Sequence, residues 1–134
     1  MRGFKKYWWW GGIVVVELLL FWQYRAHESD VHFFLHSLVG VIVALLIFTI
    51  LMLRGRRPRG LMVAAFGLHQ YAMLPDYLYQ LGYPHQPWMN LFLGHLWVDE
   101  LPYHDWILSF AVIAAAGLYL VARRYRAEAI INPL

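Results

Sequence analysis

The sequence contains no cysteine, which excludes disulfide bridges, thiolate metal ligands and a thiol nucleophile. Charge is also scarce: Asp, Glu, Lys and Arg make up 14% of the 134 residues, whereas soluble domains carry about a quarter. No glycine-rich phosphate loop is present, and no serine, histidine and aspartate surround a recognisable nucleophile turn. What remains is an apolar chain whose few polar residues need an explanation.

Hydrophobic residues make up 61% of the chain, and several windows of more than 18 apolar residues indicate transmembrane helices. The sequence therefore predicts an all-α fold, a four-helix transmembrane bundle forming one integral membrane domain over residues 1–134. The spans are expected at about 7–24, 31–53, 61–81 and 103–122. A short interfacial or re-entrant helix is expected at 88–101, because that segment is too short to cross a bilayer.

Basic residues predict the orientation of these spans. Ten of the eleven lie on one side of the four-span arrangement, and only Arg25 lies on the other. Short loops rich in Lys and Arg stay cytoplasmic, so we expect an inner-membrane protein with both termini in the cytoplasm. This topology also explains the net charge of +3, so membrane lipid is the expected partner and no nucleic-acid partner is expected.

Ionisable residues inside the predicted spans fall into two layers. A charged group in a bilayer costs at least about 2.5–3.5 kcal/mol on insertion scales, so it usually faces protein and has a partner. At a rise of about 1.5 Å per residue, His36 and Asp76 reach the same level near the outer edge. By the same arithmetic, Glu17 and His69 fall near the midplane.

The spacing of these residues indicates a metal site near the outer leaflet. Histidines or aspartates four or seven residues apart share a helix face, and three predicted helices carry such a pair. Imidazole and carboxylate together suit zinc, manganese or iron better than magnesium or calcium. We expect a divalent transition metal, zinc first and manganese or iron as alternatives. The candidate ligands are His32, His36, His69, Asp76, His95, Asp99 and His104.

Each candidate also has a structural interpretation. Asp76 follows Pro75 and could hydrogen-bond the backbone that the proline leaves without a partner. Glu17 could be a hydrogen-bonding residue inside the bundle, and Asp99 an ordinary exterior charge. One pair of histidines four residues apart is a weak signal by itself. The convergence of three such segments on one leaflet favours the metal.

Three segments resemble motifs of a known family. They are HFFLHSLVG at 32–40, LPDY at 74–77 and GHLWVDELP at 94–102. They are similar to motifs of the small inner-membrane metal-dependent hydrolases of the LexA-regulated type, although the motif order and the spacing of the histidine pair differ. The resemblance places His36 in the first motif, Asp76 in the second, and His95 with Asp99 in the third. It implies a membrane metalloprotein, and hydrolysis to a lesser extent.

Three functions remain open at this point. The first is a membrane-embedded hydrolase for a lipid or lipid-linked substrate, with Asp99 or Glu17 as the base. The second is a haem or redox protein, although His36 and His69 differ in depth by about 10 Å. The third is an accessory subunit of a larger membrane complex or a homo-oligomer, which the small residues and 18% aromatic content favour. Ion movement along Glu17, His69 and Asp76 ranks last.

Overall fold

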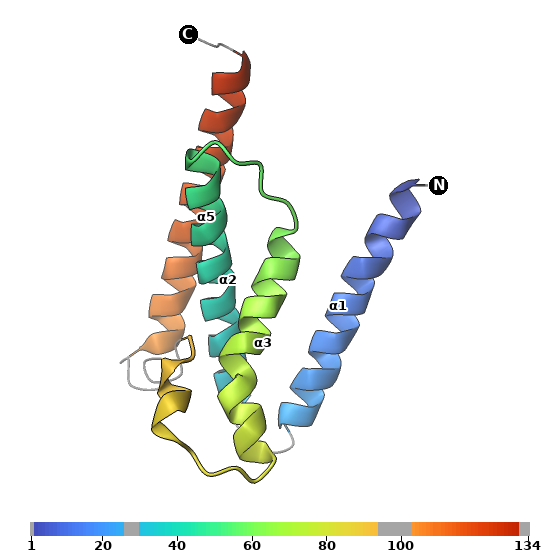
Figure 1. The fold of residues 1–134 in the computed structure, drawn as a ribbon, viewed down its shortest axis with the longest axis vertical. Helices are drawn as coiled ribbons and strands as arrows, with labels where there is room; N and C mark the ends of the chain where they lie inside the picture. Colours follow the sequence, from blue (N-terminus) through green and yellow to red (C-terminus); the bar gives the residue numbers. More distant parts are fainter. Residues whose placement is uncertain (1, 26–29, 94–102, 132–134) are drawn as a thin grey trace. The chain divides into compact units, whose positions relative to one another are not determined.

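A computed structural model describes residues 2–25, 30–93 and 103–131, and within these ranges the chain is helical (Figure 1). The described part contains four α-helices, one short 3-10 helix and no strand. The predicted all-α class is therefore confirmed. The elements are α1 (Arg2–Arg25), α2 (Asp30–Leu53), α3 (Leu61–Gln80), η1 (Pro87–Leu91) and α5 (His104–Ile131).

The helix bounds depart from the predicted spans mainly in the second half of the chain. Helix α5 continues to Ile131, nine residues beyond the predicted end of the fourth span at 122. Arg124 Nε donates to Glu128 Oε1 at 3.0 Å, and such an i,i+4 pair favours the extra turns. The short helix expected at 88–101 is seen as the five-residue η1, and residues 94–102 lie outside the described part.

The chain divides into two compact units, Met1–Phe34 and Leu35–Leu134. In the first unit, Phe21 of α1 packs against the rings of Phe33 and Phe34 at the start of α2, with both centroid separations 5.4 Å. The second unit contains the rest of α2 together with α3, η1 and α5. Helix α2 is unbroken from Asp30 to Leu53.

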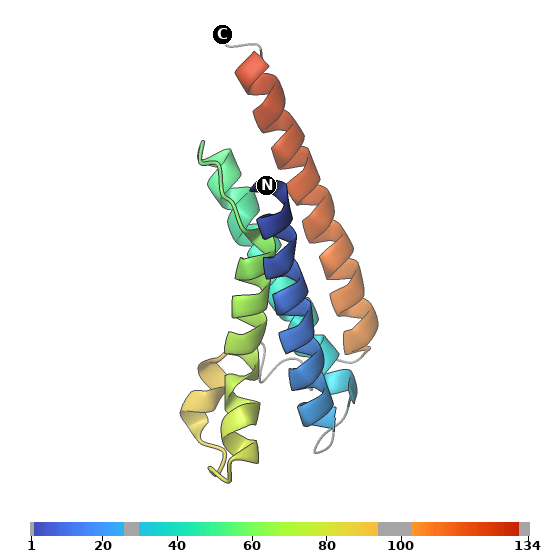
Figure 2. The same ribbon diagram turned by 90° about the vertical axis from the view of Figure 1, so that its right-hand side faces the viewer.

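Within the second unit, α3 runs antiparallel to α2 and α5 runs parallel to it (Figures 1 and 2). Leu35 and Leu108 share a buried cluster where α2 and α5 begin. At the far end, the Arg126 guanidinium of α5 donates to the carbonyl of Gly55, just beyond α2. The end of α3 and the start of α5 therefore lie at the same end as the start of α2.

Helix α2 ends in a Schellman motif, because Gly55 takes a positive φ of 81° that an L side chain rarely adopts. The amide of Arg56 donates to Leu51 O at 2.9 Å, and that of Gly55 donates to Met52 O at 3.0 Å. A short basic turn then leads to Gly60, from which α3 begins. The predicted turn between the second and third spans is observed here.

Two helices are long and apolar enough to cross a membrane, His32–Leu53 within α2 and Asp105–Ala129 within α5. At about 1.5 Å per residue they extend roughly 33 Å and 38 Å, against a hydrocarbon core of about 30 Å. Helix α1 contains a shorter apolar stretch, Trp10–Gln23. Helix α3 does not qualify, since His69, Gln70 and Asp76 interrupt it. Two of the four predicted spans are thus supported, and the four-span bundle stays a prediction.

Candidate metal centre

The first two turns of α2 bring two imidazoles to one helix face. His32 and His36 are four residues apart, so their side chains lie one above the other. His36 has no exposed surface, and His32 is half-buried. Leucine, valine and isoleucine dominate the rest of this helix, so packing and burial rather than capping hold the two histidines in place.

The third group comes from α3, where Asp76 follows a proline that the helix accommodates without ending. Pro75 has no amide hydrogen, so the carbonyl of Tyr71 loses its usual helical donor. The carboxylate of Asp76 nevertheless turns toward α2, with its Oδ2 3.4 Å from His36 Nε2. Asp76 is 8% exposed, so both partners are shielded from solvent.

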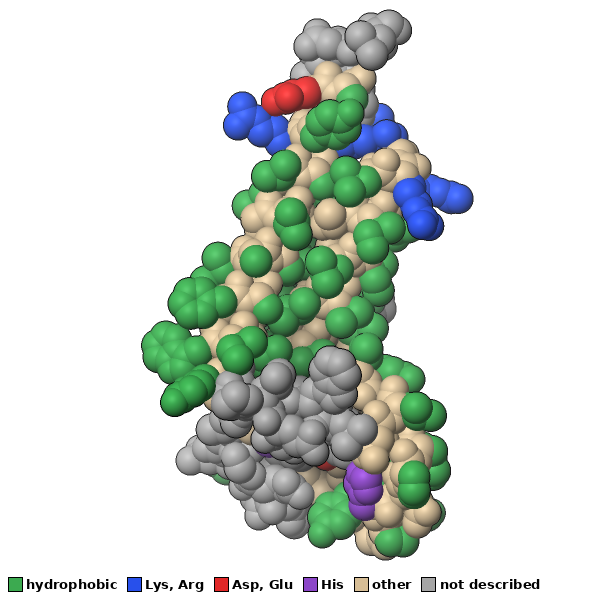
Figure 3. Space-filling view, turned by 90° about the vertical axis from the view of Figure 1, so that its left-hand side faces the viewer, with side chains coloured by type: hydrophobic (Ala, Val, Ile, Leu, Met, Phe, Trp, Pro, Cys, Tyr) green, Lys and Arg blue, Asp and Glu red, His purple; other side chains and the backbone are tan. Residues whose placement is uncertain are grey.

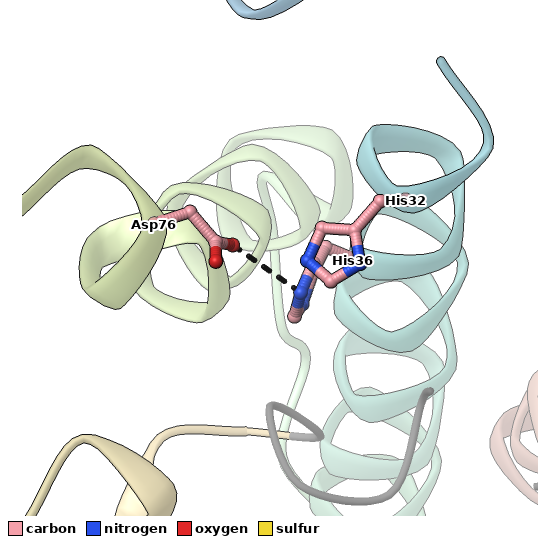
Figure 4. Close-up of side chains that lie close together, drawn as sticks. All are labelled: His32, His36 and Asp76. Atoms are coloured by element: carbon pink, nitrogen blue, oxygen red, sulfur yellow. Dashed lines mark ion pairs between the residues drawn. The ribbon is translucent and has the colours of Figure 1, made fainter. Parts of the chain in front are cut away.

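Together, His32, His36 and Asp76 could hold a metal ion (Figure 4). Each offers one ligand atom, and these atoms all lie within 4.8 Å of one another. Two ligands about 2.0–2.1 Å from a tetrahedral zinc are about 3.3 Å apart, which the separation of His36 and Asp76 already matches. Three protein ligands leave a fourth position for water or substrate, which is typical of catalytic zinc.

A close contact between the helix backbones fixes the distance between α2 and α3. A Cβ placed on Gly40 would lie 2.7 Å from His69 N and 2.9 Å from His69 Cα. Only glycine permits this approach, because the neighbouring atoms are backbone and cannot move aside. Ala72 and Met73 are fully buried on the part of α3 that leads to Asp76. The candidate metal ligands therefore lie beside a helix crossing that is tightly packed and shielded from water.

A second polar contact joins the same two helices deeper along α3. Ser37 Oγ lies 3.2 Å from His69 Nε2, and His69 is 3% exposed. His69 precedes Asp76 by seven residues, which is about 10 Å along the helix axis. His69, which the sequence suggested as a ligand, thus lies outside the group of three and contacts Ser37. Sequence reasoning missed this pairing, although Ser37 and Gly40 are three residues apart and so share a helix face.

Aromatic contacts attach η1 to the part of α3 near the centre. The rings of Tyr71 and Phe92 are 4.8 Å apart, and Trp88 packs on Phe92 with a centroid separation of 5.8 Å. Met89 is buried within η1 and accepts from the amide of Gln86. This short helix therefore packs against the side of α3 rather than extending away from it.

The remaining predicted site residues are Glu17, His95, Asp99 and His104. Glu17, a candidate base, is half-buried on α1 in the first unit. His95 and Asp99 lie in 94–102, outside the described residues. His104 is the first residue of α5. Of the four predicted ligands whose side chains the structure describes, it brings three together, and His69 is the exception.

No protein-family model matches the chain, and neither a curated protein nor a solved structure is similar to it. The feature with the clearest chemical meaning is the donor set of two imidazoles and one carboxylate, which lies near the start of the apolar helix α2.

Proposed function

We propose that this chain is a helical membrane protein that binds a divalent transition metal and hydrolyses a lipid or lipid-linked substrate. The observation that carries the proposal is the convergence of His32, His36 and Asp76, whose ligand atoms lie within 4.8 Å of one another. Zinc is the first choice of metal, because it accepts imidazole and carboxylate in tetrahedral sites with one open position. Manganese and iron accept the same ligands.

The chemistry that such a metal supplies is the activation of water and the polarisation of an ester or phosphoester oxygen. His36 and Asp76 would hold the ion from two different helices, so the site is complete only when α2 and α3 are packed together. Burial of both groups lowers the local dielectric and strengthens every electrostatic interaction with a bound substrate. The base that accepts the proton from water is not among the three ligands.

Membrane insertion is supported by the surface of the second unit. The long face of α5 is covered with hydrophobic side chains that include Trp106, Phe110 and Ile113, all exposed (Figure 3). Transferring one such side chain from water to an apolar phase is worth about 1.5–3 kcal/mol. These exposed side chains are therefore more stable in lipid than in water. In a bilayer, the metal centre would lie near one end of the spanning helices, within reach of lipid head groups.

The family resemblance adds independent support. His36 and Asp76 belong to different motifs of that resemblance, 40 residues apart in the chain, and the structure pairs their side chains at 3.4 Å. Residues that two motifs contribute to one metal should meet in this way. The resemblance therefore supports a membrane metalloprotein, and we propose hydrolysis as its reaction.

The test is the metal content of the purified full-length protein by elemental analysis. We expect about one zinc per chain in the wild type and a loss of at least about tenfold in affinity for His36→Ala. His85→Ala is the matched control, because His85 is an exposed histidine in the same unit. The same three proteins are then assayed for release of fatty acid or phosphate from phospholipid vesicles. Equal metal content in wild type and His36→Ala would refute the proposed centre.

One observation favours an accessory subunit as the second candidate. Only 11% of the apolar window in α5 is buried within the chain, so most of this helix is available to another transmembrane helix. Metal-free protein that co-purifies in a fixed ratio with another membrane protein would support this alternative. The haem interpretation receives no comparable support, because His36 faces Asp76 and His69 faces Ser37.

A further inference from the structure

Seven arginines gather at the end of the second unit that lies farthest from the metal centre. The hydrogen bond from Arg126 to the carbonyl of Gly55 joins the last turns of α5 to the turn between α2 and α3. Two groups of arginines that are remote in sequence therefore lie at one end (Figure 3). We name this set the arginine cluster. Its members are Arg54, Arg56, Arg57, Arg59, Arg123, Arg124 and Arg126.

The arginine cluster carries far more positive than negative charge. Glu128 is the only acidic residue after Asp105, and no acidic residue occurs in the turn at 54–60. Glu128 is already paired with Arg124. Six of the seven arginines are exposed, and Arg126 is half-buried. Like charges held this close repel one another, so an external anion at this end would stabilise the fold.

The residue type indicates which anion. The cluster contains no lysine, since both lysines of the chain, Lys5 and Lys6, belong to the first unit. Either residue satisfies the positive-inside preference, but only arginine presents a planar fork that binds two phosphate oxygens at once. Arg126 Nε is buried and has no hydrogen-bond acceptor within the described ranges. The exposed guanidinium groups of the other six arginines are accessible to an oxygen from outside the protein.

We propose that the arginine cluster binds the phosphate groups of anionic phospholipid head groups. The inference rests on the membrane insertion proposed above. From His32 to Arg54, α2 rises about 33 Å, so the cluster would lie in the leaflet opposite the metal centre. It is therefore a second lipid site, independent of the first, and it recognises the head group through bidentate contacts in addition to net charge.

The test counts lipids bound to the full-length protein by native mass spectrometry. Detergent-purified protein is mixed with equal amounts of phosphatidylglycerol and phosphatidylcholine. We expect a preference for phosphatidylglycerol of about fivefold or more, the effect of even one arginine near an anionic lipid surface. The diagnostic variant is the triple substitution Arg56→Lys, Arg57→Lys and Arg123→Lys. It keeps the positive charge and removes three guanidinium groups that could bind phosphate through two hydrogen bonds. We expect its preference to fall by at least about threefold.

Two outcomes would overturn the inference. A lysine variant with the wild-type preference would show that charge alone attracts the lipid. Displacement of the lipid by millimolar inorganic phosphate would show that the site takes free phosphate. The thermal unfolding midpoint of the variant is the control for folding, and it should equal that of the wild type. Wild-type protein that holds no metal but prefers phosphatidylglycerol would contradict the proposed hydrolase and leave this inference intact.

Discussion

At the scale of single residues, the contact between His36 and Asp76 matters most. An imidazole with no exposed surface facing a carboxylate that is 8% exposed is costly to desolvate, because each group loses its contacts with water. Attraction between the imidazole and the carboxylate offsets part of that desolvation cost, and a cation bound to both groups would offset more. A half-buried histidine one turn away, His32, completes a donor set for such a cation.

The substitution Asp76→Asn tests the charge of this carboxylate while keeping its shape. We expect metal affinity to fall by about tenfold to a hundredfold, because the amide oxygen is a much poorer ligand than a carboxylate. Equilibrium dialysis against zinc measures the affinity. Glu17→Gln is the control, since Glu17 is a half-buried acid of the first unit, and it should bind zinc as the wild type does. Wild-type affinity in Asp76→Asn would remove this residue from the ligand set.

A second residue-scale prediction concerns the contact between Ser37 and His69. We expect Ser37→Ala to lower the free energy of unfolding by about 0.6 kcal/mol, the typical value of an interhelical hydrogen bond in a membrane protein. Zinc affinity should not change, because this pair lies about 10 Å from Asp76 along α3. Ser109→Ala on the exposed face of α5 is the matched control. A large loss of zinc from Ser37→Ala would show that the two layers form one site.

At the scale of helices, the crossing at Gly40 sets the register on which both polar contacts depend. His36 and Ser37 precede this glycine by one turn. The partner of Ser37 is His69, the residue that Gly40 contacts, and the partner of His36 is Asp76, seven residues farther along α3. Any increase in the spacing of α2 and α3 would lengthen both contacts together. The metal centre therefore forms only when α2 and α3 are packed together.

The substitution Gly40→Ala therefore should lower both stability and metal affinity. Its Cβ would stand 2.7 Å from a backbone nitrogen, so the helices must separate, and overpacking of this kind costs about 1–3 kcal/mol. Gly67→Ala on α3 is the control, because a Cβ there meets nothing within 4 Å. Alanine in an open helical position should be neutral or stabilising by up to about 1 kcal/mol. Thermal unfolding with and without zinc compares the two, and equal effects would contradict the proposed crossing.

At the scale of the whole chain, the environment of α5 decides between a membrane protein and a water-soluble helical protein. Ile113 and Tyr125 are almost equally exposed, at 67% and 66%, but Ile113 lies mid-helix and Tyr125 lies among the arginines. In water, the two positions would meet solvent to the same extent. In a bilayer, only the second would do so.

The absence of cysteine makes this difference directly measurable. We expect a membrane-impermeant maleimide to label Tyr125→Cys at least about tenfold faster than Ile113→Cys in reconstituted vesicles, because the hydrocarbon core excludes the reagent. Labelling after solubilisation in denaturant is the control for thiol reactivity. In intact cells, Tyr125→Cys should be protected and Tyr83→Cys labelled if the arginine end faces the cytoplasm. Equal rates in vesicles would exclude a spanning α5.

Several parts of this description follow from composition and local pattern. Long apolar windows separated by arginine, glycine and proline predict helices, so α2 and α3 lie within a residue of their predicted bounds. Helix α5 runs nine residues past its predicted end, because charged residues mark the edge of a membrane span but do not stop a helix. The pairing of Arg124 with Glu128 even favours those turns.

By itself, the sequence determined the helical class and the apolar character of α2 and α5, because composition is a local property. From the rise per residue it also predicted that His36 and Asp76 lie at one depth. Depth says nothing about the rotation of one helix against another. Only the tertiary structure decided that Asp76 faces His36 while His69 turns to Ser37. The physical reason is the backbone contact at Gly40, which sets the spacing and rotation of α2 against α3 together.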